Sequence, residues 1–209
     1  MAKTSFKRKS PKRDIPRVIL IACEGKYTEP EYFKAIRQDL RSVMVKIIVL
    51  PHDGTDPLSV VNKVLEEKQD RKHDGNWLDK DSAWAVFDGD EHIQRDSNNW
   101  HQAIQKAKKE NIQLAITNPS IELWYLIHFQ DNSASISQDK ARERLNKYIP
   151  NYEKARCYYL EKLKGLTQDA IARAKVLDNL AKQSNLAEYA NPCCSGISQL
   201  VDMLLKMGN

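Results

Sequence analysis

Four short apolar runs, separated by segments of helical periodicity, constrain the fold of this chain more than any other feature. The runs occupy residues 18–23, 45–50, 83–87 and 112–117, and β-branched side chains are frequent in them. A continuous apolar run of this length is typical of a strand that is buried on both faces. Between the runs, apolar residues recur at the spacing of an amphipathic helix. Strands that alternate with helices predict an α/β fold, with a mostly parallel sheet flanked by helices.

Polar and proline residues mark where the helices between the strands begin. Thr28, with a glutamate three residues later, forms a capping-box pattern, and Asp56 places an N-cap directly before Pro57. Ser97 is expected to cap the third helix. After the fourth strand, residues 121–129 are expected to form another helix.

The pattern predicts three parts of the chain. Residues 1–14 form a basic tail, in which positions 1–13 carry six lysines and arginines and no acid. Such a tail attracts phosphate backbones without sequence preference, and a merely solvated terminus is an equally good interpretation. Residues 15–130 form the α/β core. From 131 to 209 helical periodicity dominates, which predicts a helical C-terminal half that packs on the core.

Composition argues against several classes of protein. The chain has 209 residues, 41% of them hydrophobic and 29% charged, and no apolar run approaches the roughly 20 residues of a membrane helix. The N-terminus lacks the apolar stretch of a secretory signal, so we expect a cytoplasmic protein. The four cysteines lack zinc-site spacing. Cys193 and Cys194 are adjacent, and they are interpreted as buried thiols or as a redox pair.

Acidic and polar side chains follow three of the four runs. Glu24 follows the first, Asp88 and Asp90 flank Gly89 after the third, and Asn118 follows the fourth. The carboxyl ends of parallel strands lie at one edge of a sheet, where such folds place their chemistry. The three carboxylates are therefore expected within about 10 Å of one another, close enough to share divalent cations. Because they would repel one another in a cleft, they predict a Mg²⁺ or Mn²⁺ site.

Four further side chains are candidates, and three of them have two interpretations. Lys26 contacts phosphate, or it is a surface lysine. Glu29 is a further metal ligand, or it only complements the dipole of the helix it begins. Glu91 could serve as a ligand in the same way. Glu122, among apolar neighbours, faces the acidic cleft as ligand or base, or it only starts a helix; an unpaired buried carboxylate is costly.

Three segments in order resemble the RloB-like family, also called AbiLii-like. Residues 23–33 are similar to its Glu-Gly-x-x-Thr-Glu-x-x-Tyr-Phe opening, and residues 86–92 to its Asp-x-Asp segment. Residues 118–129 resemble its Asn-Pro-x-Phe-Glu-Leu-Trp stretch with a following His-Phe, although Ile121 replaces the aromatic residue. Weaker similarity occurs at residues 170–174 and 191–192, so the resemblance covers most of the chain.

The resemblance implies a Toprim-like fold and an acidic active site. Carried over by motif, Glu24 is a general acid/base or a metal ligand, and Asp88 and Asp90 are metal ligands. The family is associated with phage defence and with a neighbouring ATPase, which makes an ATPase an expected partner. Cys193 and Cys194 stand where hydroxyl residues are common in the family, so a polar role there is not supported.

These observations support one function and leave two alternatives. The first is a metal-dependent nuclease that acts on DNA or RNA, with tRNA among the RNA candidates, as an effector of phage defence or abortive infection. The second is a non-catalytic nucleic-acid-binding or regulatory subunit of an ATPase-containing complex. A pure phosphate binder gains nothing from three carboxylates, which favours the enzyme. The third, a small-molecule phosphatase or nucleotidyl transferase, lacks the glycine-rich nucleotide loop that it would need.

Overall fold

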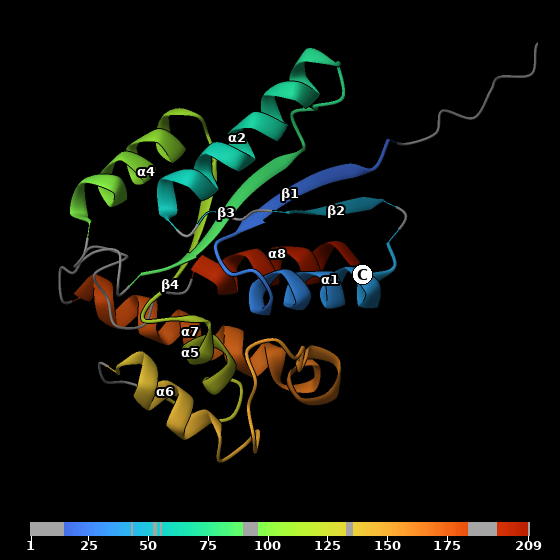
Figure 1. The fold of residues 1–209 in the computed structure, drawn as a ribbon. Helices are drawn as coiled ribbons and strands as arrows, with labels where there is room; N and C mark the ends of the chain where they lie inside the picture. Colours follow the sequence, from blue (N-terminus) through green and yellow to red (C-terminus); the bar gives the residue numbers. More distant parts are fainter. Residues whose placement is uncertain are drawn as a thin grey trace, which may run out of the picture.

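The computed structural model describes residues 15–42, 44–51, 54, 56–89, 96–132, 136–183 and 196–208 (Figure 1). Strands and helices alternate up to residue 126, and helices follow. The elements in chain order are β1 (Arg17–Cys23), α1 (Thr28–Leu40), β2 (Val45–Leu50), α2 (Pro57–His73), β3 (Ser82–Asp88), α4 (Ser97–Lys109), β4 (Gln113–Thr117), α5 (Ile121–Leu126), α6 (Gln138–Leu145), the short helical turns η1 (Tyr159–Leu163) and η2 (Lys164–Leu166), α7 (Thr167–Gln183) and α8 (Gly196–Gly208).

In the described part of the chain, four strands form one all-parallel sheet in the order β2-β1-β3-β4. The predicted α/β class is therefore confirmed, and each strand lies within one residue of its predicted run. Because the strands are parallel, their carboxyl ends share one edge of the sheet. The register places Cys23 of β1 beside Val86 of β3, and Asp88 of β3 beside Thr117 of β4.

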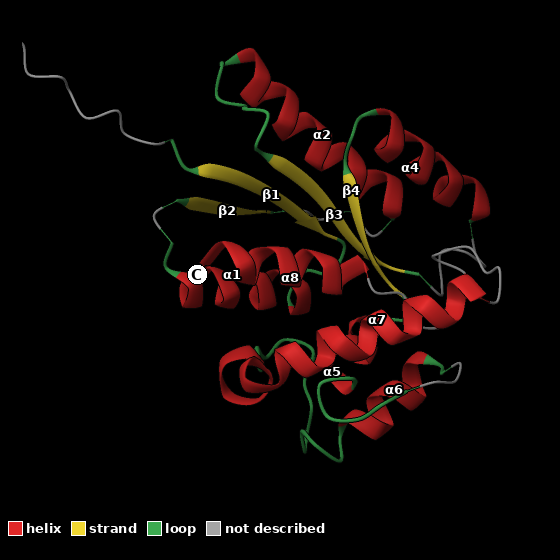
Figure 2. Ribbon diagram, turned by 180° about the vertical axis from the view of Figure 1, so that it is seen from behind, coloured by secondary structure: helices red, strands yellow, loops and turns green. Residues whose placement is uncertain are grey.

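Side chains alternate between the two faces of the sheet, as the pleat requires. Ile19 and Ile21 of β1 pack on the face that α1 and α8 cover, whereas Leu20 and Ala22 pack on the face that α2 and α4 cover. Figure 2 shows the sheet between these two helical layers. Burial on both faces explains why the strands are apolar throughout.

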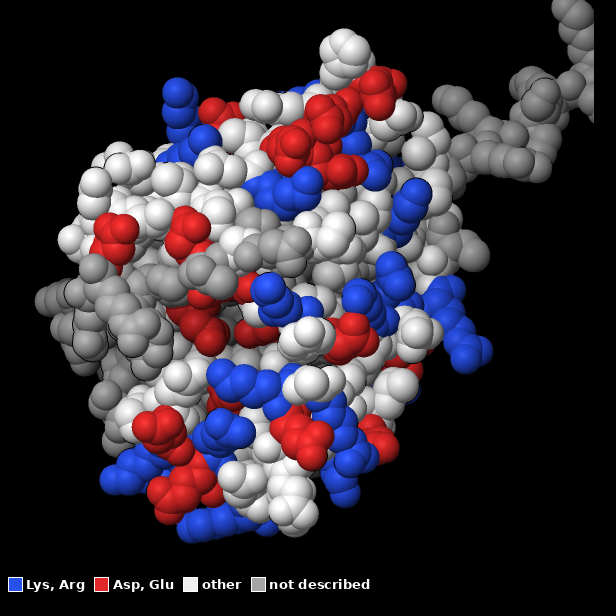
Figure 3. Space-filling view, viewed as in Figure 1, with Lys and Arg blue, Asp and Glu red and all other residues white. Residues whose placement is uncertain are grey.

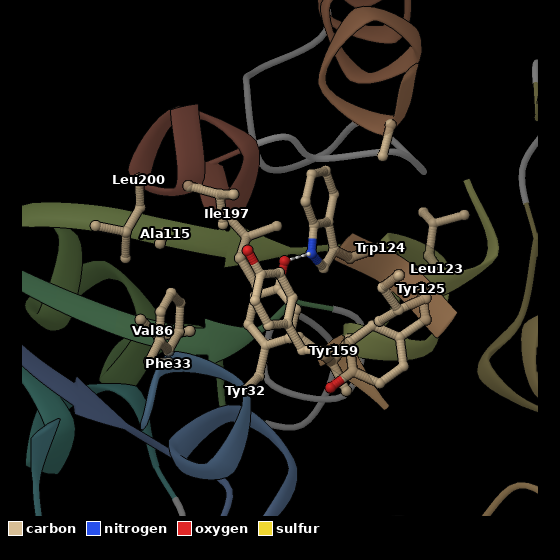
Figure 4. Packing of buried hydrophobic residues seen from close by; sticks show 14 of the residues in the cluster. Tyr32, Phe33, Val86, Ala115, Leu123, Trp124, Tyr125, Tyr159, Ile197 and Leu200 are labelled. Carbon is tan, nitrogen blue, oxygen red and sulfur yellow. Dashed lines mark hydrogen bonds between the residues drawn. The ribbon is translucent and has the colours of Figure 1, made fainter. Parts of the chain in front are cut away.

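An aromatic cluster joins the sheet to the C-terminal half (Figure 4). Trp124 of α5 donates a hydrogen bond from Nε1 to the hydroxyl of Tyr32 on α1, at 2.9 Å. Tyr159 of η1 meets the Tyr32 ring edge-on, with 5.4 Å between centroids. Tyr125 lies beside the same ring at 5.6 Å. These fully buried rings fix α1, α5 and η1 relative to one another.

After β4, every element of the described residues is helical, which confirms the predicted helical C-terminal half. The last helix, α8, lies against β4 on the face that α1 also covers. Among the described residues, no helix has both the length and the apolar character needed to cross a membrane.

Two predicted helix caps are wrong in detail. Tyr27 is the N-cap of α1, and Thr28 makes no capping bond; its hydroxyl instead donates to the carbonyl oxygen of Lys154 at 2.6 Å. Asp96, not Ser97, caps α4 by accepting from a backbone N–H. The helix expected over residues 121–129 ends at Leu126. The Asp56 cap, followed by a proline, is confirmed.

Candidate functional site

Glu24 and Asp88 meet at the carboxyl ends of β1 and β3. The backbone N–H of Glu24 donates to the Val86 carbonyl at 2.9 Å and extends the ladder by one residue. The backbone N–H of Asp88 donates to Oε2 of Glu24 at 3.2 Å. The acidic residues that follow the first and third strands are therefore adjacent.

Glu29 lies in the first turn of α1, and its side chain folds back over the β1–α1 loop. The residue is 7% exposed. A Cβ at Gly25 would stand 1.8 Å from Oε2 of Glu29, so only a glycine leaves room for the carboxylate here. This Oε2 has no hydrogen-bond partner within the described ranges. A buried carboxylate oxygen without a partner is costly unless a cation or proton accompanies it.

Burial and mutual repulsion shift the titration of these acids. Burial first, and then the charges of Glu122 and Glu24, raise the pKa of Glu29 to about 7. Burial, followed by the charges of Glu29, Glu24 and Glu122, raises the pKa of Asp88 well above its ordinary value. Lys154 opposes both shifts. We call Glu24, Glu29, Asp88 and Glu122 the acidic cluster.

Glu122 enters the acidic cluster from the first turn of α5 and is fully buried. Ser120 donates to its Oε2 at 2.7 Å, and the Tyr152 hydroxyl donates to its Oε1 at 3.5 Å. Nζ of Lys154 lies 3.6 Å from the same Oε1. The charge of Glu122 acts on both Glu29 and Asp88, and its role as a ligand or base stays a prediction.

Lys154 and Tyr152 were not candidates from the sequence. They belong to the segment between α6 and η1, which two contacts hold over the start of α1: the bond from Thr28 to the Lys154 carbonyl, and a bond from the Cys157 thiol to the Glu31 carbonyl at 3.5 Å. Asn151, with φ of 58°, marks a turn that the sequence signals as Pro-Asn. That turn predicts a loop. It does not indicate that the loop lies near carboxylates 30 or more residues away in the sequence.

The remaining sequence candidates divide into described and undescribed residues. Lys26 is exposed between Glu24 and α1. Asp90 and Glu91 lie outside the described residues, as do Cys193 and Cys194. Gly89 is described: its N–H donates to the Thr117 carbonyl at 2.8 Å, which ties the end of β3 to the end of β4.

The donor chemistry of the acidic cluster fits a hard divalent cation, although the described geometry does not enclose one. Within the described ranges, no three Asp, Glu, His or Cys side chains are grouped closely enough to hold an ion. The donors are carboxylate oxygens, which Mg²⁺ and Mn²⁺ prefer, and the unpartnered Oε2 of Glu29 is available to one. Figure 3 shows acidic side chains in a hollow near the start of α1, with basic side chains around it.

Comparison with known proteins gives one match. The model of a family described as RloB-like protein matches residues 19–204, a range that runs from β1 into α8 and contains every residue of the acidic cluster. No curated protein and no solved structure matches the chain.

Proposed function

The chain belongs to the RloB-like family, and on that premise we propose that it is a Mg²⁺- or Mn²⁺-dependent phosphoryl-transfer enzyme. More specifically, we propose a nuclease that cleaves DNA or RNA, tRNA included, as an effector of phage defence. The observation that carries the proposal is the convergence of four carboxylates, from four separate elements, with the pKa values of two of them raised.

The electrostatics of the acidic cluster favour a site that is completed by a cation. Like charges in a partly desolvated site repel strongly, and a fold that only needed stability would not gather them. Phosphodiester cleavage uses such an arrangement, because a divalent cation links carboxylates to phosphate oxygens. A neutral or sulfur-rich site would not serve this purpose.

The described residues fall into three proposed roles. Glu24, Glu29 and Asp88 are proposed to supply part of the ligand set of the cation, which supplies Lewis acidity and charge neutralisation when bound. Glu122 anchors the ammonium group of Lys154 at the edge of the acidic cluster. Lys154 is half-exposed, so its ammonium group can also reach a substrate phosphate.

Two further cation ligands are proposed outside the described residues. Asp90 is the second carboxylate of the Asp-x-Asp segment, and Glu91 follows it. Lys26, exposed at the same end of the sheet, is proposed as a second phosphate contact.

The alternative function is a non-catalytic subunit that binds nucleic acid within an ATPase-containing defence complex. It is favoured by one observation: the described residues hold no closed three-ligand group. A cytoplasmic location and an ATPase partner belong to both proposals.

The test compares cleavage by the wild type with cleavage by two isosteric variants. The purified full chain, with and without the proposed ATPase partner, is incubated with labelled duplex DNA, single-stranded DNA, RNA and tRNA in Mg²⁺, Mn²⁺ or EDTA. We expect cleavage that EDTA abolishes. Asp88→Asn should reduce the rate to background, and Glu122→Gln should slow it about 10- to 100-fold, the usual range for residues that support metal ligands. Melting temperatures of both variants should stay near that of the wild type.

Asp79→Asn is the matched control, because Asp79 is exposed in the α2–β3 loop and remote from the carboxyl ends of the strands. It should cleave like the wild type. If the wild type neither cleaves nor is toxic with the ATPase present, and Asp88→Asn leaves defence intact, the binding-subunit function is correct instead. A large loss of stability in Glu122→Gln with normal cleavage would assign Glu122 to structure.

A further inference from the structure

A basic groove lies at the opposite end of α1 from the acidic cluster. It has a volume of about 390 Å³ and is formed where α1 ends and β2 begins. Arg37 and Arg41 come from the end of α1, Lys46 comes from β2, and Pro16 also lines the groove. Figure 3 shows lysine and arginine side chains on the side of the molecule where α1 ends.

Among the described residues, no carboxylate partner pairs with the three cations of the basic groove. Arg37, Arg41 and Lys46 are exposed, and within the described ranges none of them has a carboxylate oxygen within 4.0 Å. Nearby lysines differ: Lys34 pairs with Glu31 at 2.8 Å, and Lys164 pairs with Asp39. Uncompensated positive charge gathered in one groove attracts an anion from outside the protein.

The described residues do not supply that anion. The six basic residues of positions 1–13 have the same sign as the groove. The described chain begins at Ile15, and Pro16 lines the groove, so the basic segment adjoins it in sequence. Like charges repel, so the charge of this segment does not neutralise the groove. A long polyanion is attracted by both.

The length of α1 relates the basic groove to the acidic cluster. Glu29 lies in the first turn of the helix and Arg41 follows its last residue. At 1.5 Å per residue, α1 spans about 20 Å. That distance equals about six base-pair steps along the axis of a duplex, at 3.4 Å each. A duplex whose axis runs along α1 can therefore place phosphates in the groove while a phosphate about six base pairs away reaches the carboxylates.

We propose that the basic groove binds the phosphate backbone of the nucleic acid on which the acidic cluster acts. This inference rests on the proposed function and deepens it. The acidic cluster repels phosphate until a cation is present, so the affinity for the substrate must come from elsewhere on the surface. The groove supplies it without reading sequence, because its contacts are ionic.

The test measures binding without cleavage. Anisotropy of a fluorescein-labelled duplex of about 20 base pairs, and of an RNA strand of equal length, is followed in EDTA between about 50 and 200 mM salt. The groove variant carries Arg37→Gln, Arg41→Asn and Lys46→Gln. Asparagine is chosen at Arg41 because this residue has φ of 43°, in the left-handed region that asparagine tolerates. The control variant carries Lys72→Gln, Lys108→Gln and Lys109→Gln, an equal charge loss on exposed residues of α2 and α4.

The groove variant should bind about tenfold or more weakly, and its slope of log K against log salt should fall by about 2 to 3, since each lost phosphate contact removes about 0.9. The control variant should stay close to the wild type in both quantities. Equal effects of the two variants, or an unchanged slope in the groove variant, would overturn the inference. The binding assay contains EDTA, so its result does not depend on cleavage. If the wild type binds through the groove but cleaves no nucleic acid in Mg²⁺ or Mn²⁺, the nuclease is refuted and the groove remains a nucleic-acid binding site.

Discussion

At the scale of single residues, specific neighbours set the positions of two buried carboxylates. The small size of Gly25 lets the Glu29 carboxylate fold back over its own loop, where other acids surround it. On α5, one carboxylate oxygen of Glu122 accepts a hydrogen bond from a hydroxyl. The other accepts one from a second hydroxyl and pairs with an ammonium group. Both arrangements depend on groups from distant parts of the chain, and both hold a carboxylate where burial alone would disfavour it.

His128 shows how burial changes the pKa of a side chain outside the acidic cluster. It is 1% exposed; its Nδ1 bonds the Trp124 carbonyl at 2.8 Å, and its Nε2 has no partner among the described residues. Burial, and the charge of Arg173, lower the pKa of His128 to about 4, while the Trp124 bond opposes the shift. The neutral ring is therefore the folded form at pH 7.

The free energy of unfolding should depend on pH through His128. The unfolded chain takes up a proton near the ordinary value of 6.5, whereas the folded chain does so only near 4, so His128 destabilises the fold progressively as pH falls through this window. The free energy of unfolding of the wild type, measured with urea, should lose about 2 to 3 kcal/mol more between pH 7 and pH 4.5 than that of His128→Asn. If the free energy of unfolding depends on pH in the same way for the two proteins, protonation of the His128 ring does not cost stability.

The site residues that could be found from the sequence are charged residues next to or within an apolar run. The residues that were missed have no such neighbours. Glu24 and Asp88 each follow a buried apolar run, and Glu122 interrupts one, so each stands out from its neighbours. Lys154 lies in a polar loop between helices. Lys154 approaches Glu122 only in the folded structure, and a single sequence does not indicate this ion pair.

At the scale of elements, strands were easier to predict than helix ends. A strand buried on both faces must be apolar throughout, so composition alone defines its limits. A helix cap depends on one hydrogen bond, for which other partners compete. Thr28 illustrates this, because its hydroxyl bonds Lys154, 126 positions away, instead of a backbone N–H of its own helix.

The contact between α8 and β4 leads to a prediction at this scale. A Cβ at Gly196 would lie 2.6 Å from the Ile116 nitrogen and 2.9 Å from Cα of Ala115, so the helix start rests directly on the strand backbone. Gly196→Ala should destabilise the protein by about 1 to 3 kcal/mol through overpacking, which lowers the melting temperature by several degrees. Gly165→Ala is the control, because nothing lies within 4 Å of its added Cβ, and its melting temperature should not fall. Equal melting temperatures for the two variants would mean that α8 can shift away from β4.

At the scale of the whole molecule, the two halves share one interior. The core on the α1 face contains residues of β1 and β3 together with residues of α6, α7 and α8. The division into a core of residues 15–130 and an extension of 131–209 stays a prediction, and the fold explains why sequence alone places such a boundary poorly. Periodicity changes at residue 131, but the buried surface continues across it, as the contact of Tyr32 with Tyr159 illustrates.

The acidic cluster lies where these halves meet, so cation binding should stabilise the entire fold. Its carboxylates come from the ends of β1 and β3 and from the first turns of α1 and α5, and Lys154 from the C-terminal half lies among them. A cation that binds the folded state alone adds about 2.7 kcal/mol at a concentration 100 times its Kd. For a chain of this size that corresponds to a rise of about 5 to 10 °C in melting temperature. Mn²⁺ added to the purified protein should produce this rise, and EDTA should reverse it.

Asp88→Asn separates this effect from general ionic stabilisation. The substitution removes a charge from the acidic cluster and preserves its shape, so the cation-free variant should melt at the same temperature as the cation-free wild type or higher, because repulsion is reduced. It should gain little from Mn²⁺, whereas Asp79→Asn should gain as much as the wild type. A wild type whose melting temperature ignores Mn²⁺, or an Asp88→Asn protein that gains equally, would mean that no cation binds at the carboxylates. The raised pKa values would then reflect acids that the fold keeps protonated, and the link between the two halves would rest on packing alone.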